Sequence, residues 1–118
     1  MNLTLSGVTL HVADVDRSLA FYQQFPGAEV VFHMPWRFAL LRLGTGRLGL
    51  LSDRKRPFHL EVECGDLDAT YTKFQELEIP TEGPPTVRGW GERDFLVIDP
   101  DGNLMEVGQR RTRPPTQA

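Results

Sequence analysis

The sequence predicts an α+β fold built from two copies of one βαβββ module, and three observations support it. A shift of 52 positions carries Asp14 onto Asp66 and aligns the apolar, acidic, hydroxyl and aromatic residues of 8–22 with those of 60–74. Each copy passes from a strand-like alternation to a helix-like spacing. A chain of 118 residues makes about one domain. The two copies must therefore build one domain together.

The first copy begins with alternating residues over 3–12, which predict a strand. An amphipathic helix follows, with Asp14 or Asp16 as its N-cap, and Pro26-Gly27 stops it. Three more strands are predicted, over 28–34, 36–43 and 47–52. A Gly-Thr-Gly sequence between the last two favours a tight hairpin.

The second copy repeats this order. A strand is predicted over 58–64, followed by a helix that Asp66 or Asp68 caps. A short edge strand at 86–88 and two strands, over 93–99 and 103–109, complete it. Each helix would cover one face of a four-stranded sheet. We expect the opposite faces of these curved mixed sheets to surround a cup-shaped cavity for a ligand.

The domain organisation follows from these patterns. We expect a single domain over 1–109, with a first module at about 3–52 and a second at about 58–109. The segment 53–57 has no periodicity and is predicted to link the modules. The tail 110–118 has no apolar face to bury and is predicted to be frayed.

Composition narrows the function classes. The net charge is −3, with 40% hydrophobic and 25% charged residues, as in an ordinary soluble domain. The sequence contains no basic stripe of the kind that binds nucleic acid. It also contains no apolar run that is long enough to span a membrane. We therefore expect a cytoplasmic protein with neither partner. The single Cys64 excludes an internal disulfide and is predicted to be a small packing residue.

Two stretches resemble the vicinal oxygen chelate superfamily, which includes glyoxalase I, extradiol dioxygenases, fosfomycin-resistance transferases and bleomycin-resistance proteins. They are VTLHVADVDRSLAFY at 8–22 and DPDGNLME at 99–106, and the resemblance extends from about 5 to 109. It implies the two-module fold predicted above. It also implies a cup in which His and carboxylate ligands from both modules hold a divalent cation.

The ligand set implied by the resemblance is incomplete here. His59 and Glu106 fill the second-module positions, whereas the first-module positions fall on Gly7 and on or beside Gly49. His11 shares a strand face with Gly7, but four residues of strand put it about 13 Å away. Two ligands alone would hold a metal ion weakly.

Six residues are candidates to line the ligand cavity: His11, His59, Glu61, Trp90, Arg93 and Glu106. His59 could instead be a hydrogen-bonded residue at the start of its strand, and His11 could be structural. Glu106 could pair with an arginine such as Arg93 or Arg42. Glu61 could lie at the solvated end of its sheet. Trp90, between two glycines, could close over a ligand or pack on the sheet.

Two functional hypotheses remain open. The first is a metal-free or weakly metal-binding protein of the bleomycin-resistance type, a homodimer that binds a small molecule. The alternative is a lyase, isomerase or dioxygenase that uses Zn, Ni, Mn or Fe. It would hold the metal through His59 and Glu106, with a further ligand from His11 or from a dimer mate.

Overall fold

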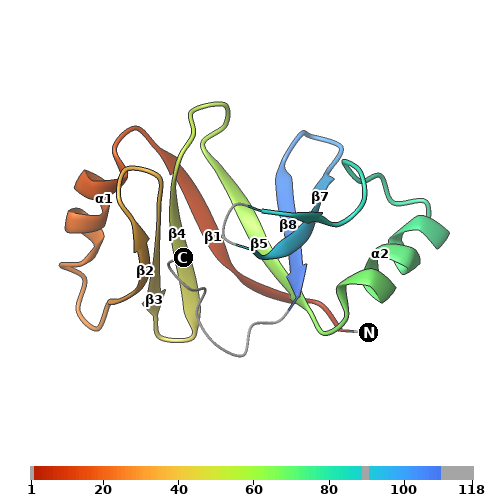
Figure 1. The fold of residues 1–118 in the computed structure, drawn as a ribbon, viewed down its shortest axis with the longest axis horizontal. Coiled ribbons are helices and arrows are strands. Elements are labelled where there is room, and N and C mark those ends of the chain that lie inside the picture. Colours follow the sequence, from red (N-terminus) through yellow and green to blue (C-terminus); the bar gives the residue numbers. More distant parts are fainter. Residues whose placement is uncertain (1, 89–90, 110–118) are drawn as a thin grey trace. The chain divides into compact units, whose positions relative to one another are not determined.

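The computed structural model describes residues 2–88 and 91–109, and the predicted tail at 110–118 lies outside them. These described residues form two helices and eight strands, whose course is drawn in Figure 1. In chain order they are β1 (Thr4–Val12), α1 (Val15–Tyr22), β2 (Glu29–Met34), β3 (Phe38–Leu43), β4 (Gly46–Ser52), β5 (Phe58–Cys64), α2 (Leu67–Glu76), β6 (Thr86–Val87), β7 (Arg93–Ile98) and β8 (Leu104–Gln109). The predicted βαβββ order thus occurs twice.

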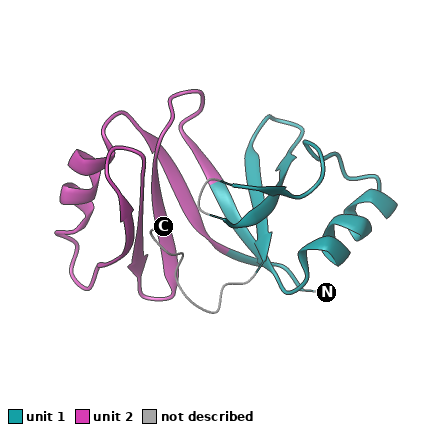
Figure 2. Cartoon of the chain, viewed as in Figure 1, with its two compact units in different colours: residues 1–5, 60–115 teal, residues 6–59, 116–118 magenta. Residues whose placement is uncertain are grey.

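The chain forms two compact units (Figure 2). The α1 unit comprises 6–59, and its strands follow the order β2-β3-β4-β1. The α2 unit comprises 2–5 and 60–109 of the described residues, and its strands follow the order β5-β8-β7-β6. In each unit the first strand pairs in parallel with the last, and the other pairs are antiparallel. The predicted α+β class with mixed sheets is therefore confirmed.

The two helices begin in the same way, as the sequence repeat requires. The Asp14 carboxylate accepts a hydrogen bond of 3.0 Å from the backbone N–H of Arg17. The Asp66 carboxylate accepts one, also of 3.0 Å, from the N–H of Ala69. Each aspartate satisfies one backbone donor that the first helical turn leaves unpaired. Of the two aspartates considered at each start, the first of the pair is the cap.

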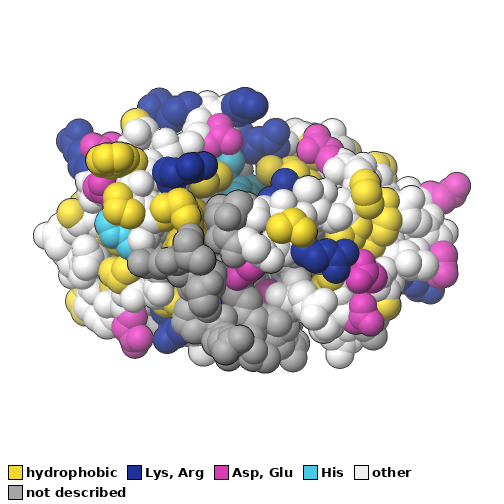
Figure 3. Space-filling model, viewed as in Figure 1, with side chains coloured by type: hydrophobic (Ala, Val, Ile, Leu, Met, Phe, Trp, Pro, Cys, Tyr) yellow, Lys and Arg dark blue, Asp and Glu magenta, His cyan; other side chains and the backbone are white. Residues whose placement is uncertain are grey.

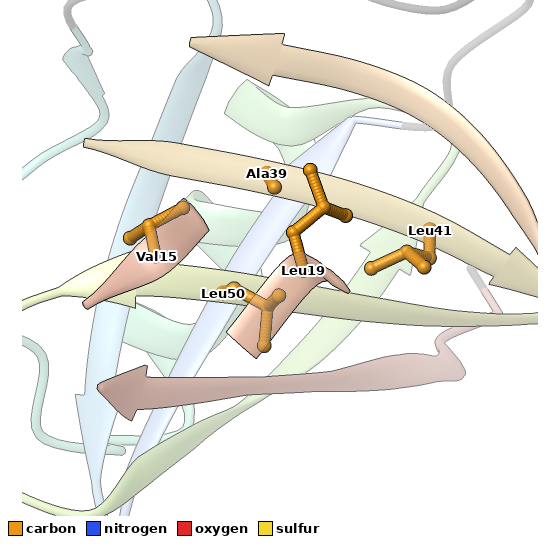
Figure 4. Close-up of a cluster of buried hydrophobic side chains, with 5 residues drawn as sticks. All are labelled: Val15, Leu19, Ala39, Leu41 and Leu50. Atoms are coloured by element: carbon orange, nitrogen blue, oxygen red, sulfur yellow. The ribbon is translucent and has the colours of Figure 1, made fainter. Parts of the chain in front are cut away.

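The core of the α1 unit lies between its helix and its sheet. Val15 and Leu19 of α1 pack on Ala39 and Leu41 of β3 and Leu50 of β4 (Figure 4). All five side chains are buried. Burying a side chain such as Leu stabilises a fold by roughly 1.5–3 kcal/mol. This cluster therefore holds the helix against strands β3 and β4.

The α2 unit has an equivalent core. Leu67 of α2 packs on Cys64 of β5, Phe95 of β7 and Val107 of β8. Cys64 is fully buried, and its thiol lies 3.4 Å from the carbonyl oxygen of Gly108. Its predicted role as a packing residue is confirmed. Because this core lies on one face of the sheet, alternate residues of β5 and β8 point to the other face.

One prediction about the first copy is wrong. The sequence places Trp36 in the third strand, but β3 begins at Phe38. Trp36 lies in the preceding turn with φ at 69° and is 78% exposed. Its backbone N–H donates to the Asp16 carboxylate at 3.4 Å, and His33 contacts the same oxygen at 2.8 Å. A positive φ in a residue other than glycine is a feature that strand periodicity does not reveal.

Charged side chains of both signs are interspersed over the face drawn in Figure 3. This distribution agrees with the small net charge of −3. Among the described residues, no helix is long and apolar enough to cross a membrane.

Candidate functional site

Three side chains that can bind a metal ion converge on strands β5 and β8. His59 and Glu61 are two residues apart on β5, so they point to the same face of the strand. Glu106 of β8 lies directly opposite Glu61 in the parallel register. One ligand atom from each of His59, Glu61 and Glu106 lies within 4.8 Å of the other two. This group contains both metal ligands expected from the sequence and adds Glu61.

The dimensions of this group suit a divalent ion. Bonds of about 2.1 Å to one ion separate ligand atoms by about 3.4 Å in a tetrahedron and about 4.2 Å at opposite corners of an octahedron. The observed limit of 4.8 Å therefore requires only small side-chain movements to close around an ion. An imidazole with two carboxylates is a donor set typical of divalent metals in proteins. His59 is buried, and Glu61 and Glu106 are half-buried.

The carboxylates of Glu61 and Glu106 also impose an electrostatic cost. Glu61 and Glu106 are register partners on neighbouring strands and their ligand oxygens lie within 4.8 Å, so two charged carboxylates there would repel each other. A bound cation would neutralise both carboxylates and relieve the repulsion. The arrangement therefore favours the binding of positive charge at this point.

The equivalent positions of the first module carry no such group. The repeat maps His59 onto Gly7 and Glu61 onto Thr9, and Thr9 lies opposite Gly49 on β4. A Cβ atom added at Gly7 would collide with the backbone carbonyl of Arg47, and one at Gly49 would collide with the Thr9 hydroxyl. The glycines thus permit close packing of β1 against β4. A ligand side chain could replace Gly7 only if these strands shifted, and could replace Gly49 only if the Thr9 side chain moved.

His11 contacts His59, one of the three residues of this group. Its Nε2 lies 2.7 Å from Nδ1 of His59, and the two rings meet edge to face at 74°. Burial lowers the pKa of His11 below its ordinary value of 6.5, the neighbouring His59 lowers it further, and Asp53 acts in the opposite direction. His11 is therefore a neutral imidazole near pH 7. This contact uses one of the two ring nitrogens through which His11 could bind a metal as a further ligand.

The arginines expected near Glu106 pair with other carboxylates. Arg93 makes two hydrogen bonds, of 2.8 and 3.2 Å, with Asp68, and their contact lowers the pKa of that carboxyl. Arg42 lies 3.3 Å from Glu29. These contacts pair Arg93 and Arg42 with carboxylates other than Glu106.

Arg88 is a residue that the sequence pattern did not single out. Its Nε donates at 2.7 Å to the carboxylate of Asp94, which is 3% exposed. This bond raises the pKa of Arg88, and the charge of Glu106 adds to the effect. Arg88 thus places positive charge near Glu106 while it remains bonded to Asp94. Trp90, one of the candidates to line the ligand cavity, lies outside the described residues.

The sequence pattern contained a signal for the third ligand. Glu61 follows His59 by two positions in a strand, and this spacing places both side chains on one face. The family resemblance instead implied that the remaining ligands would come from the first module. The register of β5 with β8, which sets Glu61 opposite Glu106, comes from the structure alone.

Comparison with known proteins supports the assignment of the fold. Residues 4–107 match the family model described as the Glyoxalase/Bleomycin resistance protein/Dioxygenase superfamily. A search of curated proteins found no significant match.

Several solved structures are similar to the chain at low sequence identity. A methylmalonyl-CoA epimerase from Streptomyces coelicolor, in complex with 2-nitronate-propionyl-CoA, has a TM-score of 0.74 at 19% identity, covering 96% of this chain and 98% of that one. A superfamily member from Vibrio splendidus 12B01 has a TM-score of 0.70 at 19% identity, covering 92% and 100%. A hypothetical protein from Bacillus halodurans C-125 has a TM-score of 0.76 at 14% identity, covering 98% and 100%.

These structural similarities concern the fold, since fold alone does not transfer function. The family match spans nearly the whole chain, and the paired βαβββ modules agree with it. The chain belongs to the Glyoxalase/Bleomycin resistance protein/Dioxygenase superfamily, as its resemblance to the vicinal oxygen chelate proteins predicted.

Proposed function

We propose that the protein binds one divalent metal ion through His59, Glu61 and Glu106 and uses it to hold an oxygen-bearing small molecule. The observation that carries this proposal is the convergence of three ligand atoms within 4.8 Å of one another. Three protein ligands are the usual number in catalytic metal sites, where the remaining positions accept water or substrate. The first module need not contribute a ligand in this arrangement.

The donor set favours one class of chemistry within the superfamily. Non-haem iron oxygenases typically use two histidines and one carboxylate, whereas this group has one histidine and two carboxylates. Carboxylate-rich sites suit Mn²⁺, and an imidazole with carboxylates also suits Zn²⁺ or Ni²⁺. We therefore favour a lyase or isomerase over a dioxygenase.

The residues have distinct roles in this proposal. When bound, the metal would act as a Lewis acid that polarises a substrate carbonyl or enolate oxygen. Glu61 and Glu106 supply the negative charge that holds the cation. His59 supplies the neutral ligand and, because it is buried, shields one side of the site from water.

A metal-free small-molecule-binding protein of the bleomycin-resistance type is the second candidate. It is favoured by Gly7, Thr9 and Gly49, which occupy the first-module positions without offering a usual metal ligand. A homodimer and a small-molecule ligand are part of both proposals. Sedimentation velocity tests the dimer directly, with one species of twice the chain mass as the expected result.

Calorimetric titration with Zn²⁺ and Mn²⁺ distinguishes the two candidates. Protein stripped with a chelator should bind one ion per chain, and His59→Ala and Glu106→Gln should each weaken binding by at least tenfold. His33→Ala is the matched control, because His33 lies on β2 and contacts Asp16. Unchanged binding in both site variants would rule out the metal centre, and absence of binding in the unaltered protein would favour the metal-free candidate.

A further inference from the structure

The contact between His11 and His59 determines which nitrogen of His59 is available to a metal ion. Nδ1 of His59 lies 2.7 Å from Nε2 of His11, a hydrogen-bonding distance. The two residues are 48 positions apart in the chain. Because Nδ1 takes part in this contact, a metal ion held by His59 would be bound through Nε2.

A hydrogen bond between two ring nitrogens contains one proton, and metal binding decides on which nitrogen that proton must lie. An imidazole nitrogen binds a metal through its lone pair and therefore carries no proton. If Nε2 of His59 binds the ion, the proton of that ring lies on Nδ1 and is donated to His11. Nε2 of His11 must then be an acceptor, with the proton of its own ring on Nδ1.

The backbone at His11 fixes the position of its ring. Nδ1 of His11 is buried and forms no well-formed hydrogen bond with the described residues. The backbone N–H of His11 donates at 2.9 Å to the carbonyl of Pro57, which fixes the end of β1 beside the start of β5. The ring is therefore held in place.

We propose that His11 is a positioning residue of the metal centre. It accepts the Nδ1 proton of His59, fixes the tautomer and plane of that ring, and directs Nε2 toward Glu61 and Glu106. This inference rests on the proposed metal function, but it assigns His11 a role different from that of a further metal ligand. Hydrogen-bond partners of ligating histidines typically change metal affinity 10–100-fold when removed.

Two variants separate hydrogen bonding from packing. His11→Phe keeps an aromatic ring of similar shape but has no acceptor. His11→Gln places an amide oxygen close to where Nε2 lies in histidine. We expect Co²⁺ affinity, measured by calorimetry, to fall 10–100-fold in His11→Phe and to return to within about threefold of the unaltered protein in His11→Gln. The Co²⁺ absorption spectrum of His11→Gln should match that of the unaltered protein.

Nuclear magnetic resonance of the unaltered protein gives a test that requires no variant of His11. With ¹⁵N-labelled histidine and saturating Zn²⁺, the His59 ring should carry its proton on Nδ1 and its metal on Nε2. The His11 ring should show no metal-bound nitrogen. His59→Gln and His33→Gln samples assign the three ring signals.

The possible results separate the two proposals. Full Co²⁺ affinity in His11→Phe, equal weakening in both His11 variants, or a metal-bound His11 ring would each overturn the positioning role. Those results would leave the metal centre standing. Lack of Co²⁺ and Zn²⁺ binding by the unaltered protein would overturn the proposed function itself, and the positioning role with it.

Discussion

Replacing Glu61 with glutamine should stabilise the metal-free protein while it removes metal binding. Glu61 and Glu106 face each other across β5 and β8, and their ligand oxygens lie within 4.8 Å. Glutamine keeps the size and shape of glutamate but removes one of the two negative charges. A residue retained for metal binding at a cost in stability should show this opposite pair of effects.

Coulomb's law sets the size of the gain. Taken at the upper limit of 4.8 Å, two unit charges repel by about 1 kcal/mol in water and by about 3 kcal/mol at an effective dielectric constant of 20. Arg88 offsets part of this repulsion, because its charge acts on Glu106. We therefore expect the free energy of unfolding to rise by about 1 kcal/mol. For a chain of this size, that is a rise in Tm of about 4 °C.

Thermal unfolding followed by circular dichroism, with and without Zn²⁺, measures both effects. In chelator, Glu61→Gln should melt above the unaltered protein. With Zn²⁺ at about one hundred times its Kd, the unaltered protein should gain about 2.7 kcal/mol, whereas the variant should gain little. Glu63→Gln is the matched control, since Glu63 lies on the same strand opposite Gly108. It should keep the Zn²⁺ effect.

A metal-free Glu61→Gln variant that melts below the unaltered protein would refute the repulsion argument. A variant that keeps the full Zn²⁺ stabilisation would refute the role of Glu61 as a ligand. The Tm in chelator and the increase in Tm with Zn²⁺ are separate measurements. The repulsion between the carboxylates and the role of Glu61 as a ligand are therefore tested separately.

Two further predictions concern the scaffold, and one concerns assembly. Gly49→Ala should lower the free energy of unfolding by about 1–3 kcal/mol through a clash with the Thr9 side chain, and adding Thr9→Ala should recover part of the loss in urea titrations. Hydrogen bonds from the Asn103 side chain and backbone lower the pKa of Asp99 below its ordinary value of 3.8. The stability they provide should therefore be present above pH 3.8 and be lost as the pH falls through the lower folded-state value, a decline that Asp99→Asn should lack in acid unfolding curves. The unaltered protein should sediment as a dimer at micromolar concentration, and a single monomeric species would contradict that proposal.

The sequence predicted the helices and strands well because each copy of the repeat has the residue spacing typical of its strands and helix. Asp14 and Asp66 cap their helices, and Val15 and Leu67 are both fully buried in the two cores. Alternation and helical spacing encode such positions directly. Trp36 was missed because its positive φ belongs to a turn that no periodicity marks.

The site was predicted less completely, because it depends on pairing between strands. His59 and Glu106 were expected from the family resemblance, and Glu61 was a candidate for the cavity alone. Its position opposite Glu106 follows from the register of β5 and β8, which is set by the whole fold. The bond between His11 and His59 likewise joins residues 48 positions apart, beyond the reach of local patterns.

The metal centre can be tested most directly by anomalous diffraction at the zinc absorption edge, using crystals grown from chelator-treated protein with one equivalent of Zn²⁺. The proposed centre predicts one strong peak per chain, bonded to Nε2 of His59 and to carboxylate oxygens of Glu61 and Glu106. A peak elsewhere, or none at this group under conditions where the protein is saturated in solution, would contradict it.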